Sequence, residues 1–231
     1  MKRPYVLLSC AMSVDGFIDD TTGERLLLSN EADFDRVDAE RSKCDAILIG
    51  AETLRRDNPR LLVNSPDRRA AREARGLPPY PLKVTMTQSG NLDPDLKFWH
   101  HGGAKLAYAA AAAAPALRVR LGDLAEVAEV GETVQVAALL EDLGARGIGK
   151  LMVEGGGTIH TQFLEAGLVD EIQLAVAPFF VGDPAAPKFV NPAVFPDGPG
   201  RRMVLADVQA VGDMAVLRYL PAAAAAGRSA A

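Results

Sequence analysis

The residues best suited to chemistry lie late in the chain, where an apolar run ends in three glycines. Val153-Glu154 leads into Gly155-Gly156-Gly157, and a helix is expected to open at Thr158-Ile159. Glycines let a ligand approach the main chain, and the unpaired N–H groups of a helix start attract a diphosphate. The motif is not G-x-G-x-x-G, which disfavours a standard Rossmann domain. A tight strand-to-helix turn without a ligand is the alternative interpretation.

A second polar segment, Thr53 to Leu61, follows an apolar strand that ends at Gly50. A loop beyond the carboxyl end of a buried strand lies where α/β sheets bind ligands. Asp57 is the candidate acid of this loop, although an aspartate ahead of Asn58-Pro59 is also a turn former. A third segment, Met12 to Gly16, carries an Asp-Gly pair, which is a common turn signal.

The elements that position these segments alternate along the chain. Buried strands are expected over residues 6–12, 46–50, 83–87, 105–108 and 150–154, with later strands over 171–177, 203–211 and 214–220. Helices are expected from a cap at Asn30 or Ser29 to about Lys43, and over residues 134–143 and 158–166. The pattern predicts an α/β fold with a mainly parallel sheet, helices on both faces and a C-terminal antiparallel hairpin.

Residues 1–221 are expected to form one domain, because no linker or repeat divides them. The alanine-rich residues 222–231 are expected to be a disordered tail.

Composition excludes several classes of protein. The formal net charge is -5, the opposite of the basic surplus that a nucleic-acid binder needs. Cys10 and Cys44 are the only cysteines, they form no CxxC pair, and we expect reduced core thiols and no metal site. The chain has no apolar run of about 18 residues and no leader pattern, so the sequence predicts no membrane span and a cytoplasmic protein.

Six segments, taken in order, resemble the reductase domain of riboflavin biosynthesis. They are residues 12–16, the helix ending near Arg41, and residues 45–50, 53–61, 153–156 and 167–171. The resemblance covers about residues 5–220. It implies a dihydrofolate-reductase-like, three-layer α/β/α fold, NADPH as hydride donor and a homodimer. The deaminase that many bacteria fuse to this domain carries His-x-Glu and Pro-Cys-x-x-Cys zinc motifs, and neither occurs here.

The resemblance also implies roles for single residues. Asp57 and Glu154 match acids at the reacting centre, with Glu154 holding the pyrimidine or ribose and Asp57 serving proton delivery or positioning. The positions implied for the cofactor are Met12, Thr53, Asp57, Thr87, Ser89, Gly155, Gly156, Gly157, Thr158 and Ile159. The positions implied for the substrate are Arg41, Arg60, Leu61 and Glu154.

Three positions depart from the family pattern. Ser9 stands where the fused enzymes carry lysine, Asn64 stands where they carry a phosphate-binding arginine, and Gln88 replaces a serine beside the adenosine 2′-phosphate. Nearby arginines are candidates to compensate for Asn64, since guanidinium groups bind phosphate well. These candidates are Arg60, Arg68, Arg69 and Arg72. A solvated helix face is the alternative interpretation for residues 68–75.

The implied reaction reduces the ribosyl side chain of a phosphorylated aminopyrimidine to ribityl with hydride from NADPH. The first alternative is a reductase of dihydrofolate or another pterin-like heterocycle on the same fold, because fold does not fix substrate. The second is a non-catalytic nucleotide-binding module, which Ser9 and Asn64 favour. The arginine-rich segment suits a 5′-phosphate better than a folate tail.

Overall fold

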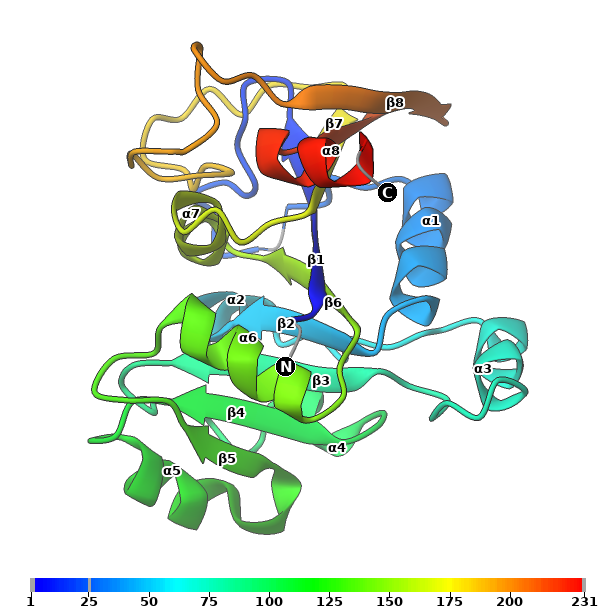
Figure 1. Ribbon diagram of the computed structural model, residues 1–231. Helices are drawn as coiled ribbons and strands as arrows, with labels where there is room; N and C mark the ends of the chain where they lie inside the picture. The colour runs from blue at the N-terminus through cyan, green and yellow to red at the C-terminus, as the bar shows by residue number, and fades with distance from the viewer. Residues whose placement is uncertain (1–2, 25, 230–231) are drawn as a thin grey trace. The chain divides into compact units, whose positions relative to one another are not determined.

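The computed structural model describes residues 3–24 and 26–229. Its contacts divide the chain into two compact units (Figure 1). The first unit holds Val37–Met152 with the first residues of the chain, and the second holds Tyr5–Arg36 and Val153–Ala231. The chain passes from one unit to the other after residues 4, 36 and 152, so neither unit is one continuous segment. The single domain expected over residues 1–221 stays a prediction.

The first unit carries strands in the order β5-β4-β3-β2-β6, and β2, β3, β4 and β5 pair in parallel. Its strands are β2 (Ala46–Gly50), β3 (Leu82–Thr87), β4 (Lys105–Ala109), β5 (Glu126–Glu129) and the first half of β6 (Lys150–Gly155). Its helices are α2 (Ala51–Asp57), α3 (Pro66–Glu73), α4 (Lys97–His100), α5 (Ala114–Leu121), the short 3-10 turn η1 (Gly122–Leu124) and α6 (Val136–Ala145). All five residues of β2 are buried, as expected for a strand that reads as one apolar run.

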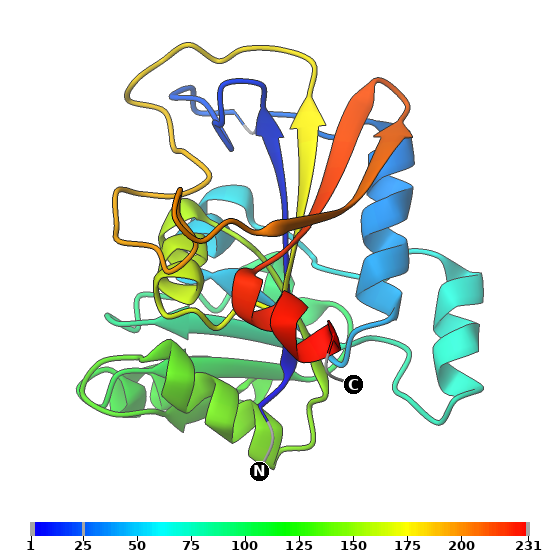
Figure 2. The same ribbon diagram turned by 45° about the horizontal axis from the view of Figure 1, so that its top comes forward.

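The second unit carries strands in the order β6-β1-β7-β9-β8. Its elements are β1 (Tyr5–Ser13), the second half of β6, α7 (Gly157–Glu165), β7 (Glu171–Ala177), β8 (Val204–Val211), β9 (Met214–Leu220) and α8 (Ala222–Ser229). β1 and β7 are parallel, whereas β9 is antiparallel to both β7 and β8 (Figure 2). Its core includes Ala175, Ala177, Met214 and Val216.

Most of the predicted elements are confirmed, with ends that agree to within two residues. α1 (Glu31–Ser42) begins where expected, because the Asn30 side chain accepts a hydrogen bond from the Asp33 N–H at 2.8 Å. The hairpin of β8 and β9 turns at Gly212, whose φ is 62°. The α/β class with mostly parallel strands and a C-terminal antiparallel hairpin is therefore confirmed.

The C-terminal segment differs from its prediction. Residues 222–229 form α8 where disorder was expected, and residues 230–231 lie outside the described residues. Alanine has the highest helix propensity, and Asp197 accepts a hydrogen bond from the Ala222 N–H at 3.0 Å. A low-complexity composition was therefore a poor guide to disorder here. No helix in the described part of the chain is long and apolar enough to cross a membrane.

Candidate functional site

The predicted site residues occur in both units, and each unit positions its own set. In the first unit, Thr53 and Asp57 lie on α2, which starts directly after the buried strand β2. The loop expected from residue 53 is therefore a helix up to Asp57. α2 buries Ala51 and Leu54, and its C-cap is Asn58, whose φ of 42° is left-handed. Both Thr53 and Asp57 remain half-buried on this helix.

The segment after α2, residues 60–65, has no regular secondary structure, and charged side chains bind its main chain. Lys83 donates to the Arg60 carbonyl at 3.0 Å, and Arg41 donates to the Leu62 carbonyl at 3.0 Å. Arg69 donates to the carbonyls of Val63 and Asn64 at 2.9 and 2.6 Å, while Asp38 accepts from the N–H groups of Asn64 and Ser65. We call residues 60–65 the clamped segment.

Leu61 lies in the middle of these contacts with a φ of 51° and is 5% exposed. A bulky residue in the left-handed region is uncommon, and such conformations persist only where surrounding contacts hold them. The clamped segment is therefore held in one conformation by side chains from α1, α3 and β3 instead of by a strand or helix.

Three arginines that follow the clamped segment use their guanidinium groups to bind other groups of the protein. Arg68 pairs with Asp38 at 3.0 Å, and Arg69 binds the clamped segment. Arg72 is 1% exposed and donates to the carbonyls of Pro78, Ser42 and Cys44 at 2.7–2.9 Å. The solvated helix face considered for residues 68–75 is thus wrong at Arg72, because three carbonyls outside the helix need its donors.

Arg60, the first residue of the clamped segment, differs from these three arginines. It is exposed, and its guanidinium makes no hydrogen bond within the described residues. Asn64 is also exposed, but its main chain belongs to the clamped segment. Among the candidate arginines, Arg60 thus keeps its guanidinium donors unused by the described residues.

Thr87 and Ser89 lie in the turn that follows β3. Thr87 is 5% exposed, and its hydroxyl accepts from the Gly90 N–H at 3.1 Å; the exposed Ser89 hydroxyl accepts from the Asn91 N–H at 3.3 Å. Each hydroxyl keeps its own hydrogen available as a donor. Gln88 uses its carbonyl oxygen to accept from the Val134 N–H at 3.2 Å, so it anchors a neighbouring loop.

Two exposed arginines reach the same turn. Arg120 from α5 donates to the Gly90 carbonyl at 3.0 Å, and Arg55 from α2 donates to the Asn91 carbonyl at 2.9 Å. Arg55 also pairs with the exposed Glu52. Two hydroxyls and two guanidinium groups therefore gather on residues 87–91, which is a donor set that suits a phosphate.

In the second unit, the end of β1 is pinned by Asp15. Its carboxylate accepts from the Ser13 hydroxyl at 2.5 Å and from the N–H groups of Val181 and Gly182 at 3.1 and 2.8 Å. Burial raises the pKa of Asp15, but these hydrogen bonds outweigh it and lower the pKa below its usual value. The Asp-Gly pair is therefore a structural turn, and Met12 is half-buried near the end of the strand.

The glycine motif joins β6 to α7 without a side-chain cap. Gly156 takes the N-cap position with φ 81° and ψ 160°, a conformation open to glycine, and no side chain of the described residues caps the helix. A Cβ at Gly157 would lie 2.4 Å from the Lys188 carbonyl oxygen. Gly156 is thus required by its backbone conformation and Gly157 by close packing, yet the first-turn N–H groups of α7 remain suited to an anion.

A strap of residues 187–191 holds this first turn. The Asn191 N–H donates to the Thr161 hydroxyl at 2.8 Å, and His160 Nδ1 lies 3.0 Å from the Phe189 carbonyl. Burial lowers the pKa of His160 to about 4, although the bond to Phe189 opposes the shift, so the ring is neutral. A neutral ring must donate from Nδ1 to that carbonyl, which makes His160 a structural contact of α7.

Glu154 is half-buried near the end of β6, two residues ahead of Gly156. Its position at the carboxyl end of the strand fits the substrate role that the resemblance implies. Across the described residues, no group of three or more His, Cys, Asp or Glu side chains could hold a metal ion.

The sequence interpretation missed the residues that bind the clamped segment. Lys83 is a single charge inside an apolar strand, and that isolation was the available signal. Asp38 and Arg69 gave no such signal, because charged residues on helices are usually solvated.

Comparisons with known proteins give a consistent result. A family model described as the RibD C-terminal domain matches residues 4–217. The 2,5-diamino-6-ribosylamino-4(3H)-pyrimidinone 5′-phosphate reductase of Archaeoglobus fulgidus is 38% identical over 187 residues, which cover 80% of this chain and 85% of that protein.

Two solved structures are similar to this chain. Acinetobacter baumannii RibD, form 1, has a TM-score of 0.77 and 25% identity; the match covers 95% of this chain but only 58% of that one. A pyrimidine reductase-like protein from Corynebacterium diphtheriae has a TM-score of 0.78 and 22% identity, with 94% and 92% covered. The second likeness is evidence of fold alone.

Proposed function

We propose, from the premise that this chain belongs to the RibD C-terminal domain family, that it is the NADPH-dependent reductase of the riboflavin precursor. The substrate in this proposal is 2,5-diamino-6-ribosylamino-4(3H)-pyrimidinone 5′-phosphate, the compound in the name of the Archaeoglobus relative. The observation that carries the proposal is the uncapped first turn of α7 after Gly155-Gly156, because a dinucleotide coenzyme needs such a set of N–H groups for its diphosphate.

The donor sets support a nicotinamide coenzyme with a 2′-phosphate. The N–H groups of Gly157, Thr158 and Ile159 would hold the diphosphate. Thr87, Ser89, Arg55 and Arg120 would hold the 2′-phosphate, since all four gather on one turn. Met12, Thr53 and Asp57 remain predicted coenzyme contacts by resemblance. The turn of residues 87–91 favours NADPH over NADH. NADH has no 2′-phosphate, so it would leave the guanidinium groups of Arg55 and Arg120 without a phosphate partner.

The substrate set is Arg41, Arg60, Leu61 and Glu154. Arg60 would bind the 5′-phosphate, because its exposed guanidinium is not used by the protein. Leu61 presents its backbone from the clamped segment, and Arg41 holds the Leu62 carbonyl. Glu154 would fix the pyrimidine or the ribose by accepting hydrogen bonds from it.

When bound, the reduced coenzyme would supply hydride to C1′ of the opened ribosyl chain. The protein has to place donor and acceptor carbons about 3–3.5 Å apart, which makes positioning the main contribution of its side chains. Opening the ribosylamine ring requires a proton at the ring oxygen or imine. Asp57 is the acid that we assign to proton delivery or positioning there.

We also propose that the enzyme is a homodimer in the cytoplasm. β8 is the last strand of its sheet order, and it exposes Val204, Leu205 and Val208 at 47–55%. Natural proteins rarely leave an apolar edge strand uncovered, and a second copy of the chain is the simplest cover. Cys10 and Cys44 are buried and form no disulfide, which fits a reducing compartment.

Turnover tests the assignment. The protein is mixed with NADPH or NADH and with the diaminopyrimidinone phosphate, its deaminated uracil form or dihydrofolate, and the absorbance of the reduced nicotinamide is followed. We expect oxidation of NADPH with the diaminopyrimidinone. Oxidation with dihydrofolate alone would instead support the pterin-type reductase. Coenzyme binding without oxidation in any mixture would support the non-catalytic module.

A further inference from the structure

Lys83 places its amine where the charged form is unfavourable. The side chain lies on the buried strand β3 and is 1% exposed. No carboxylate of the described residues pairs with it. Its ammonium group donates to the carbonyls of Arg60 and Phe98 and lies 4.4 Å from the centre of the Phe98 ring. Burying an ion without a counter-ion costs several kcal/mol, so this lysine needs a reason beyond filling space.

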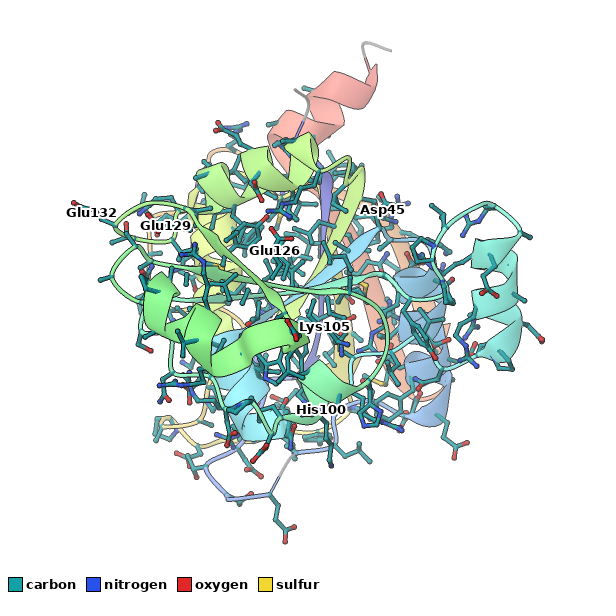
Figure 3. All side chains as sticks on the ribbon, turned by 90° about the horizontal axis from the view of Figure 1, so that it is seen from below. Asp45, His100, Lys105, Glu126, Glu129 and Glu132 are labelled. Atoms are coloured by element: carbon teal, nitrogen blue, oxygen red, sulfur yellow. The ribbon has the colours of Figure 1, made fainter. Side chains whose placement is uncertain are left out.

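The surroundings of Lys83 also disfavour its charged form. Burial, and then the charge of Lys105, lower the pKa of Lys83 to about 7. Lys105 lies directly opposite Lys83 in the parallel register of β3 and β4, and is labelled in Figure 3. A lysine next to another lysine inside a strand pair gains nothing from its neighbour.

One of the two carbonyls that Lys83 binds, that of Arg60, belongs to the clamped segment. The Arg60 carbonyl is the group immediately before Leu61, and the Leu62 carbonyl immediately after Leu61 is held by Arg41. The two cations therefore bracket the residue with the left-handed φ of 51°. An apolar side chain at position 83 would leave the carbonyls of Arg60 and Phe98 without this donor.

We propose that Lys83 is a positioning residue for the phosphorylated substrate. By holding the Arg60 carbonyl, it fixes the backbone from which the Arg60 guanidinium and Leu61 reach the substrate. Lys83 itself does not touch the substrate in this scheme. The inference rests on the proposed substrate role of Arg60 and Leu61, and it names the residue that makes their conformation rigid.

The chain offers a matched control for this role. Arg72 is also a cation that is 1% exposed, and it also donates to main-chain carbonyls, those of Pro78, Ser42 and Cys44. None of these carbonyls belongs to the clamped segment. R72M therefore removes a buried cation of the same kind from a place that the substrate role does not involve.

The test compares K83M and R72M with the wild type in steady-state kinetics. For K83M, we expect the KM for the diaminopyrimidinone phosphate to rise at least tenfold while the KM for NADPH stays within about twofold. K83R, which keeps a charged donor, is expected to recover part of the loss. R72M is expected to lower the melting temperature without separating the two KM values. Should K83M fail to fold, K83Q keeps an uncharged donor, and the same separation is expected at smaller size.

Hydrogen exchange gives a readout that needs no substrate. In K83M, the amides of residues 61–63 are expected to exchange faster than in the wild type, and in R72M they are not. An unchanged pyrimidine KM in folded K83M overturns the proposal, as do equal rises of both KM values or the same separation in R72M. A wild type that turns over no pyrimidine refutes the proposed function instead, and the exchange experiment then still decides whether Lys83 holds the segment.

Discussion

Arg218 holds the carboxylate of Glu171 with two hydrogen bonds, from Nε at 2.7 Å and from Nη2 at 2.9 Å. The two residues join β9 to β7, and Tyr5 on β1 adds a third hydrogen bond at 2.7 Å. Burial by itself raises the pKa of Glu171, but the bonds from Arg218, Gln173 and Tyr5 outweigh it and lower the pKa to about 2. One carboxylate thus connects three neighbouring strands of the second unit.

This pairing predicts a loss of stability in acid. Because the pKa of Glu171 is lower in the folded protein than in the unfolded chain, its contribution is complete above pH ~4.5 and is lost as pH falls towards 2. We expect E171Q to remove on the order of 2–3 kcal/mol of unfolding free energy at pH 7. Urea unfolding at pH 7 and at pH 3 measures the difference, which shrinks at the lower pH. E165Q, at an exposed position of α7, is the control and should change neither value.

Lys83 predicts a second rise of stability with pH, at high pH instead of in acid. Its pKa is about 7 in the folded protein and about 10.4 when unfolded, so the unfolded chain binds more protons between these values. Stability from this group therefore rises as pH increases from 7 to 10.4, by on the order of 3–5 kcal/mol.

The measurement is the difference in unfolding free energy between wild type and K83M across that range. A constant difference would show that Lys83 is not a strongly shifted, buried cation. Lys105 also has a pKa lowered by burial, and its contribution is present in both proteins and largely cancels.

The turn of residues 87–91 predicts the choice of coenzyme. R120A is expected to raise the KM for NADPH by about fivefold to tenfold, as for one lost hydrogen bond to a charged group at an exposed site, and to leave the KM for NADH unchanged. R118A, two residues earlier on α5, removes a guanidinium that donates to the Val127 carbonyl instead. Equal losses with both coenzymes in R120A would contradict a 2′-phosphate at this turn.

The close approach at Gly157 predicts a specific cost for a single methyl group. G157A places a Cβ 2.4 Å from the Lys188 carbonyl oxygen, so the strap or the first turn of α7 has to move. We expect a loss of about 1–3 kcal/mol of stability and weaker coenzyme binding. G198A adds the same methyl group where nothing lies within 4 Å, and it should be close to neutral. Thermal unfolding and coenzyme titration of both variants provide the check.

The elements with strong local signals could be predicted from the sequence. β2 reads as one apolar run, and α1 begins at a capping asparagine, because both depend on neighbours in the chain. α8 was mistaken for a disordered tail because low complexity and helix propensity make opposite predictions for alanine. The parallel strand β5 was missed, since four residues with exposed glutamates at both ends carry little periodicity.

The candidate site could be predicted only in part. The turn before α7 and the helix after β2 are local, so their residues were visible as motifs. The clamped segment depends on Asp38, Arg69 and Lys83, which lie up to 27 residues from the groups that they bind. No local pattern encodes such contacts. The arginines showed the same limit, because Arg72 and Arg60 look alike in sequence but only Arg60 is free of protein partners within the described residues.

The interleaving of the two units has a consequence for synthesis on the ribosome. β1 emerges first, but its parallel partner β7 follows about 160 residues later, with Leu7 opposite Glu171. The Val37–Met152 unit is nearly continuous, so the ribosome completes its residues before it makes β7, the parallel partner of β1. A stalled or truncated product that ends before β7 would therefore carry an apolar N-terminal strand that lacks its β7 partner. Such a strand is a target for chaperones and a starting point for aggregation.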